Sequence, residues 1–143
     1  MVLGAFYEGG IGVKKDDVEA AKWTRKAAEQ GQVDAQFILG LVYAEGHGVP
    51  QDYAEAAKWL RKAADQGNLR AQGHLGDLYQ KGLGVPQNFE EAYFWYVLAA
   101  TSGDKTAVDA RDQTGAQLSQ QQVTEVQKRA SDWKPTPTAA SAQ

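Results

Sequence analysis

The feature that most constrains this chain is a sequence pattern that recurs every 36 residues. Between Gly46 and Gly67 the chain reads Gly-x-Gly-Val, then an Asp or Asn position, Ala-x-x-Trp, Ala-Ala and a closing glycine. The same pattern starts again 36 residues upstream at Gly10 and 36 residues downstream at Gly82. Three copies at one period indicate an array of structural units, each of which buries its apolar face against its neighbours.

Each repeat is predicted to contain two helices. In the middle repeat, apolar residues at three-to-four spacing predict a first helix over residues 33–45, named helix A here. Asp52, followed three residues later by Glu55, predicts the N-terminus of a second helix, helix B, which continues to about residue 66. The other repeats carry the equivalent pairs Asp16/Glu19 and Asn88/Glu91.

Glycine and proline are predicted to separate these helices. Gly46 to Pro50 should form the turn after helix A, because glycine adopts positive φ and proline cannot continue a helix. The same turn is expected at Gly10-Ile11-Gly12, and Gly67 is expected to end helix B in the left-handed region. A further glycine recurs inside helix A and indicates close packing of helix B there: Gly4, Gly40 and Gly76.

Tryptophan recurs once in every helix B, and a packing role is expected for Trp23, Trp59 and Trp95. Trp59 is predicted to lie buried between repeats two and three. A denser aromatic cluster, Phe89 and Tyr93 to Tyr96, is expected to pack partly against the last helices. Because aromatic residues are also enriched at interfaces, a ligand surface on this cluster stays open.

The repeats divide the chain into five parts. Repeat 1 covers 1–31 and is expected to be truncated at its first helix, since Met1 aligns with Phe37. Repeat 2 covers 32–67 and repeat 3 covers 68–103. A degenerate helix A and a C-terminal cap follow over 104–134, where Ser119-x-x-Gln122 predicts the start of the capping helix. The remaining part, 135–143, has few apolar residues and is predicted to be a flexible tail.

These residues together resemble the Sel1-like repeat, a 36-residue relative of the tetratricopeptide repeat. The resemblance rests on Ala71-x-x-x-Leu75-Gly76-x-x-Tyr79 and on the Gly-x-Gly-Val-Pro, Ala-x-x-Trp and Ala-Ala-x-x-Gly elements, and it extends over residues 1–117. It implies an all-α fold, a right-handed α-α solenoid of about three repeats plus a C-terminal capping helix. It also implies a non-enzymatic adaptor that binds proteins or peptides in a concave groove lined by the A helices. The resemblance further implies a bacterial protein, either periplasmic or secreted or else cytoplasmic, and the sequence itself does not decide the compartment.

The composition excludes several other classes. A formal net charge of -3 gives no basic surface for nucleic acid, and no apolar run approaches the roughly 20 residues that span a bilayer. The chain has no cysteine and only two histidines, so neither a metal site nor a cofactor is expected. Ser102-x-x-Lys105 matches a motif of penicillin-interacting enzymes, but Gly103 should end a helix between the two residues, and no catalytic residue is predicted.

Candidate partner-binding residues follow from the resemblance. The concave positions of helix A vary between repeats, which favours a role in binding, although simple exposure accounts for variation equally well. We expect Phe37 and Leu41, one helical turn apart, to form a solvent-facing apolar anchor beside charged residues. The predicted set is Asp34, Phe37, Leu41, Glu45, Arg70, Asp77 and Lys81.

Two alternatives to the adaptor remain open at the level of sequence. The first is a structural or assembly segment of a longer array, which self-associates as a homo-oligomer through residues 1–30 at its open end. The more remote alternative is an envelope hydrolase of the penicillin-interacting kind that uses Ser102 and Lys105. The sequence names no specific partner.

Overall fold

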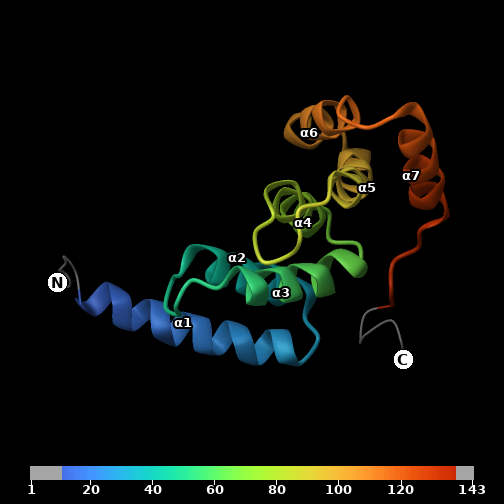
Figure 1. Cartoon of the computed structure of the whole chain (residues 1–143). Coiled ribbons are helices and arrows are strands. Elements are labelled where there is room, and N and C mark those ends of the chain that lie inside the picture. The colour runs from blue at the N-terminus through green and yellow to red at the C-terminus, as the bar shows by residue number, and fades with distance from the viewer. Residues whose placement is uncertain (1–10, 138–143) are drawn as a thin grey trace.

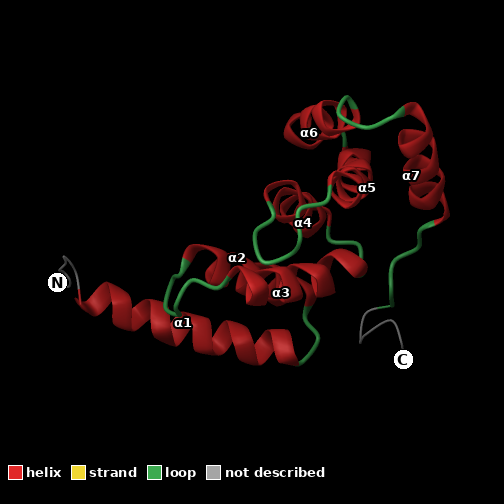
Figure 2. Cartoon of the chain, viewed as in Figure 1, coloured by secondary structure: helices red, strands yellow, loops and turns green. Residues whose placement is uncertain are grey.

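The chain is all-helical throughout the part that the structure describes. A computed structural model describes residues 11–137, and no strand occurs among them (Figure 2). The helices are α1 (Ile11–Glu29), α2 (Val33–Glu45), α3 (Tyr53–Asp65), α4 (Leu69–Lys81), α5 (Phe89–Ala99), the short 3-10 helix η1 (Ala100–Ser102), α6 (Lys105–Gly115) and α7 (Gln120–Asp132). The predicted all-α fold is confirmed.

The helices stack in pairs along one direction. Helices α2 and α3 pack on each other, α4 and α5 do the same, and α1 packs on α2 (Figure 1). Helices α2, α4 and α6 are therefore the A helices of successive repeats, whereas α1, α3 and α5 are the B helices. The closing helix α7 packs against α5.

Helix α1 differs from the prediction for the first repeat. Gly10 lies outside the described residues. Within the described residues the chain is helical from Ile11 to Glu29, so the expected turn is wrong at Ile11 and Gly12, and the expected N-cap at Asp16 is wrong as well. The cause is a single position: Lys14 stands where the other repeats carry Pro50 and Pro86. Without a proline, the helix can extend through this segment. The predicted first helix of repeat 1 and Gly4 lie outside the described residues.

The predicted helix ends of repeats 2 and 3 are confirmed. The Asp52 carboxylate accepts a hydrogen bond of 3.1 Å from the Glu55 N–H, and the Asn88 side chain accepts the equivalent bond from Glu91. Gly67 has φ 96°, in the left-handed region. These contacts satisfy backbone groups that a helix terminus leaves unpaired, and so they fix the length of each helix.

The glycine inside helix A permits the close approach that the sequence predicted. A Cβ atom placed on Gly40 would lie 2.6 Å from Cγ of Leu60, and one on Gly76 would lie 2.8 Å from Cε1 of Tyr96. Helix B of the same repeat therefore occupies the space of the missing side chain at both positions.

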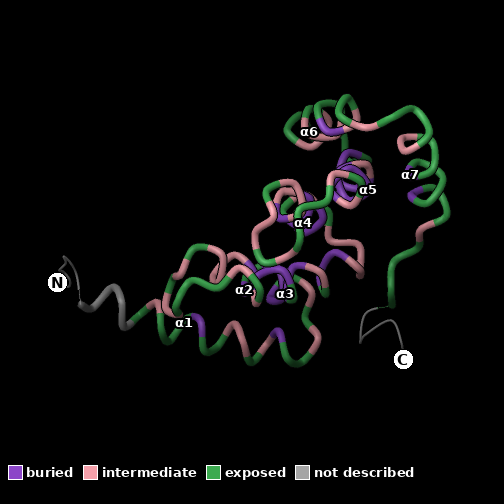
Figure 3. Tube along the Cα trace, viewed as in Figure 1, coloured by how far each residue is buried: buried purple, intermediate pink, exposed green. Residues whose placement is uncertain are grey.

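Buried residues occur along the stack from α1 to α7 (Figure 3). They form two hydrophobic clusters. The larger extends from α2 to α7 and contains buried Tyr93, Phe94 and Trp95. Trp95 meets Trp133 edge-on at 6.5 Å between ring centroids, so the aromatic cluster of α5 does cover the last helices as predicted. Because its members from Tyr93 to Tyr96 are buried, most of this cluster is unavailable as a ligand surface.

Two of the tryptophan predictions need correction. Trp59 is buried, with 4% of its surface exposed, but it packs with Ala28 and Leu39, between repeats one and two. Trp23 is 63% exposed and is not a packing residue in this structure. Trp59 lies near Arg25 of α1 and Trp95 lies near Arg61 of α3, each in the helix B of the preceding repeat, whereas no described helix precedes α1 to cover Trp23.

The C-terminal cap forms as predicted. Ser119 and Gln122 make a complete capping box at the start of α7, and Val126 and Ala130 are buried against the core. The chain then turns back toward α3, where the Thr136 N–H donates a hydrogen bond of 2.7 Å to the Asp65 carbonyl. The start of the predicted tail is thus held in place, and residues 138–143 lie outside the described part.

Candidate binding groove

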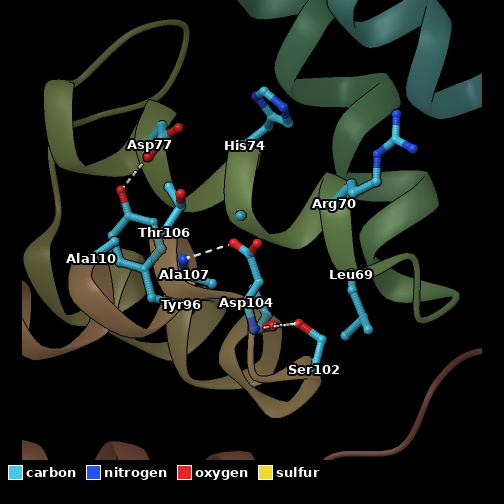
Figure 4. Close-up of a pocket in the computed structure, with 12 residues that line it drawn as sticks. Leu69, Arg70, His74, Asp77, Tyr96, Ser102, Asp104, Thr106, Ala107 and Ala110 are labelled. Atoms are coloured by element: carbon cyan, nitrogen blue, oxygen red, sulfur yellow. Dashed lines mark hydrogen bonds between the residues drawn. The ribbon is translucent and has the colours of Figure 1, made fainter.

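A pocket of about 450 Å³ opens between the A helices α4 and α6 (Figure 4). Residues of α5 and of the turn that follows it complete the lining. The pocket is lined by Leu69, Arg70, Gly73, His74, Asp77, Tyr96, Ala99, Ser102, Asp104, Thr106, Ala107 and Ala110. We name this the α4–α6 pocket. Its volume lies within the range of about 300–1,000 Å³ that is common for ligand sites.

The walls of the pocket are mainly apolar and small. Gly73 lies on α4, Ala99 on α5, and Ala107 and Ala110 on α6. None of these side chains extends beyond a methyl group, so the space between the helices stays open. A pocket with this lining favours an apolar group of matching size over a charged one.

Tyr96 supplies a fixed polar group on one wall. Its hydroxyl donates to Oδ1 of Asp77 at 2.5 Å, and Oε1 of Gln80 lies 3.1 Å away. Burial raises the pKa of Tyr96, and the hydrogen bond to Asp77 and the negative charge of that carboxylate raise it further. The phenol therefore remains neutral, and the Asp77 carboxylate is held in one orientation.

Asp104 and Ser102 form the opposite edge of the pocket. Asp104 accepts a hydrogen bond from the Ala107 N–H at 3.1 Å and so caps α6, and its own N–H bonds to the Ser102 hydroxyl at 3.2 Å. Figure 4 shows both bonds. Asp77 and Asp104 thus place two carboxylates at the pocket.

The Ser102-x-x-Lys105 motif is not arranged for catalysis. Gly103, with φ 81°, separates η1 from α6, as the sequence predicted. The Ser102 hydroxyl donates to the Ala99 carbonyl at 3.1 Å, and Nζ of Lys105 pairs with Asp109 at 3.0 Å. Each group is therefore engaged with a different partner, and the serine lacks the adjacent base that would activate it.

The expectation that Phe37 faces solvent is wrong. Only 4% of its surface is exposed, and it belongs to the larger core cluster. The following repeat covers its ring, since the Arg70 guanidinium lies 4.9 Å from the ring centroid and the His74 ring lies 5.6 Å away. Leu41 is partly buried against the same core, so the two residues do not make an exposed anchor.

The structure brings together only some of the predicted partner-binding residues. Arg70 and Asp77 line the α4–α6 pocket. Asp34, Phe37 and Arg70 line a second hollow of about 440 Å³ between α2 and α4. The other three predicted residues, Leu41, Glu45 and Lys81, line neither hollow. Oε1 of Glu45 instead lies 3.1 Å from Nε2 of His47 in the turn after α2.

Sequence reasoning missed the part of the pocket that comes from outside the A helices. Tyr96, Ala99 and Asp104 were not among the predicted partner-binding residues. Tyr96 belonged only to the aromatic cluster for which a ligand surface stayed open, and Ala99 was expected to serve in packing. A signal was present in the replacement of large residues by Gly73 and Ala110 at positions where the preceding repeat carries Phe37 and His74.

Other kinds of site find no support in the described residues. No group of three or more histidine and acidic side chains lies close enough to hold a metal ion within residues 11–137. In the same range, no helix combines the length and apolar character needed to cross a membrane.

The family of the chain follows from a comparison with known repeats. The Sel1 repeat matches three times in succession, over residues 1–32, 33–68 and 69–104. The chain belongs to the Sel1 repeat family. Sel1 repeats form helical solenoids that typically serve in protein interactions and are generally not catalytic. No curated protein matches the chain.

Two solved structures support the assignment. The first is c5321, a protective antigen present in uropathogenic Escherichia coli strains that displays an SLR fold; it is 36% identical, with a TM-score of 0.77 over 81% of this chain. The second is a Sel1 repeat protein from Oxalobacter formigenes, 46% identical, with a TM-score of 0.60 over 63% of this chain. The chain spans 25% of the first protein and 37% of the second.

Proposed function

We propose that this Sel1 repeat chain is a non-enzymatic adaptor module that binds a peptide or protein segment in the groove between its A helices. The observation that supports this function is the α4–α6 pocket, an apolar hollow of about 450 Å³ with Asp77 and Asp104 in its lining. An apolar site supplies affinity, and charges beside it supply orientation and register.

The architecture of the groove fits this function. The A helices α2, α4 and α6 each pack on a B helix, so that side chains along the groove project from helices held in place by the core. Binding to a preformed surface costs little conformational entropy in the protein. Arg70 lies between the two hollows and lines both, and it is therefore the proposed contact for a segment that runs along the groove.

A displayed library of random peptides tests this function. Peptides enriched on the purified chain are expected to bind in the groove, so their affinity should fall about tenfold or more in the variant Ala110→Trp, which fills the pocket. Gln121→Trp, at an exposed position on α7, is the matched control and should leave the affinity unchanged. Enriched peptides that bind both variants equally well would contradict the groove as the site.

A second candidate function is assembly, and the observation that favours it is Trp23. This residue holds the register of Trp59, yet it is 63% exposed, and Val18 on the same helix is 50% exposed. Helix α1 thus exposes two large apolar side chains, of which Trp23 holds the register that packs against a neighbouring repeat at Trp59. Such a side chain favours stacking on a further repeat or on a second copy of the chain.

A further inference from the structure

Consecutive repeats differ at one position in a way that bears on the α4–α6 pocket. Phe37 of α2 and Gly73 of α4 occupy the same place in the 36-residue repeat. The second repeat therefore carries an aromatic ring where the third carries only hydrogen.

The ring of Phe37 is enclosed by the repeat that follows it. It shares a core cluster with Ala63 and Ala71, and Arg70 and His74 of α4 cover it. The guanidinium and the imidazole lie 4.9 Å and 5.6 Å from the ring centroid. An aromatic ring thus fills the space between the successive A helices α2 and α4.

The residues around Gly73 repeat this arrangement with smaller side chains. Ala99 and Ala107 stand where Ala63 and Ala71 lie around Phe37, and Thr106 and Ala110 replace Arg70 and His74. All four of these residues line the α4–α6 pocket. The pocket therefore has the walls of the Phe37 site, while the ring and its two covering side chains are missing.

The space at Gly73 is open from the backbone outward. A Cβ atom built on Gly73 would meet only the Cβ of Ala99, at 3.9 Å, which is an ordinary contact. Gly40 and Gly76 differ, because Leu60 and Tyr96 fill the corresponding space there. Close packing of helix B therefore does not account for the glycine at position 73.

We infer that the α4–α6 pocket is a slot for an aromatic side chain from a bound peptide segment, which takes the place that Phe37 fills in the preceding repeat. This inference rests on the proposed adaptor function and adds the chemistry of the occupant. The volume of about 450 Å³ admits a phenylalanine ring together with the adjoining main chain.

Charge at the pocket favours a basic residue next to that aromatic side chain. Asp77 and Asp104 both line the pocket, and the Tyr96 hydroxyl and the Ala107 N–H fix their positions. In Figure 4 the side chains of Arg70 and His74 extend away from Asp104 and Ser102. The bound segment therefore meets two carboxylates there, and a lysine flanking the aromatic ring complements them.

Three short peptides test the slot. Capped heptapeptides of sequence Gly-Ser-Lys-X-Lys-Gly-Ser, with X as Phe, Leu or Ala, are titrated into the isotope-labelled chain, and amide shifts are followed by NMR. The Phe peptide should bind about tenfold more tightly than the Ala peptide and more tightly than the Leu peptide. Its shifts should centre on Gly73, Ala107 and Ala110. Replacing both lysines of the Phe peptide by glutamate should lower its affinity for the chain.

The variant Gly73→Phe supplies the missing ring from within the chain. It should abolish binding of the Phe peptide and raise the melting temperature, because the ring fills an apolar space. Gly73→Ala is the matched control, which leaves most of the slot open and should retain binding. Ala110→Leu narrows the slot from the opposite wall, so it tests the same point should Gly73→Phe fail to fold.

The outcomes separate the slot from the adaptor function. If library peptides bind the groove without an aromatic residue, or if Gly73→Phe binds them unchanged, the aromatic slot is wrong and the adaptor function stands. If no peptide of any sequence binds, the adaptor function fails and the slot fails with it. Concentration-dependent shifts of the same amides in the absence of peptide would place a second copy of the chain in the slot and overturn the peptide as occupant.

Discussion

Glycine serves two opposite purposes within the A helices. At Gly40 and Gly76 the missing side chain lets helix B approach, and Leu60 and Tyr96 occupy its space. At Gly73 nothing but the Ala99 methyl comes near, so the missing side chain leaves an opening. A glycine in a helix interior costs on the order of 1 kcal/mol relative to alanine, which close packing offsets at the first two positions but not at the third.

Substitution by alanine should therefore have opposite signs at these positions. Gly73→Ala is expected to raise the free energy of unfolding by about 0.5–1 kcal/mol, because it adds helix propensity without a clash. Gly76→Ala should lower it by about 1–3 kcal/mol, the usual cost of overpacking, since its Cβ would lie 2.8 Å from the Tyr96 ring. Urea denaturation of both variants measures the difference, and an equal effect at the two sites would contradict this account.

Phe37 offers a second test at a single side chain. Because its ring is buried beneath Arg70 and His74, Phe37→Ala should lower the free energy of unfolding by about 3–5 kcal/mol. Phe89→Ala, at a partly exposed position on α5, serves as the comparison and should cost less. A Phe37→Ala variant that unfolds like the wild type would restore the solvent-facing anchor that the sequence suggested.

Asp65 gives the fold a dependence on pH. Burial raises the pKa of this carboxyl, and the nearby charge of Arg61 opposes the rise only in part. Asp65 is also the last residue of α3, where the helix dipole disfavours a negative charge. The folded chain thus holds this proton more tightly than the unfolded chain, so stability is lost as the pH rises from about 4 through the folded-state pKa.

The variant Asp65→Asn should remove that loss. At pH 7 it is expected to be more stable than the wild type by up to about 1 kcal/mol, the scale of a helix-dipole interaction. The advantage should disappear below about pH 4, where the carboxyl is protonated in both states. Melting temperatures of the two proteins from acid to neutral pH check the trend, and a constant difference across that range would contradict it.

At the scale of helices, periodicity and glycine spacing predict most of the elements because those signals are local. Asp52 and Asn88 cap their helices as expected, and α2, α4 and α7 appear where the pattern placed them. The prediction failed at α1, where Lys14 replaces proline and the turn is lost. It also failed for Phe37, because burial of a helix A residue depends on side chains from a different repeat.

The contact between neighbouring B helices supplies a test at this scale. Trp59 of α3 packs with Ala28 of α1, and Arg25 of α1 lies 5.9 Å from its ring. Trp59→Ala should therefore cost about 3–5 kcal/mol and should loosen α1 first. Hydrogen exchange of α1 amides, compared with those of α5, measures where the loss falls, and equal loss in both helices would argue against this junction.

At the scale of the whole molecule, the first and the last described helices of the stack differ in how far their side chains are covered. At one end, α7 covers α5, with Arg129 of α7 paired to Glu91 at 2.6 Å and stacked on Phe94. At the other, α1 presents Trp23 and Val18 to solvent. The covering helix α7 could be predicted, because the Ser119-x-x-Gln122 capping box is a local signal. The exposure of Trp23 could not be read from its own position, because all three tryptophans hold the same register in the repeat.

The exposed apolar side chains of α1 should make this chain associate. We expect concentration-dependent self-association through Trp23, because a large exposed apolar side chain is removed from water when two copies meet there. Trp23→Glu should shift the equilibrium toward monomer, while the control Leu69→Glu, which alters an exposed apolar residue at the α4–α6 pocket, should leave it unchanged. Sedimentation over a wide range of concentrations measures both variants. A wild-type chain that stays monomeric at every concentration would leave the groove as the only proposed interaction surface, and a dimer that tolerates Trp23→Glu but not Leu69→Glu would move the interface to the groove.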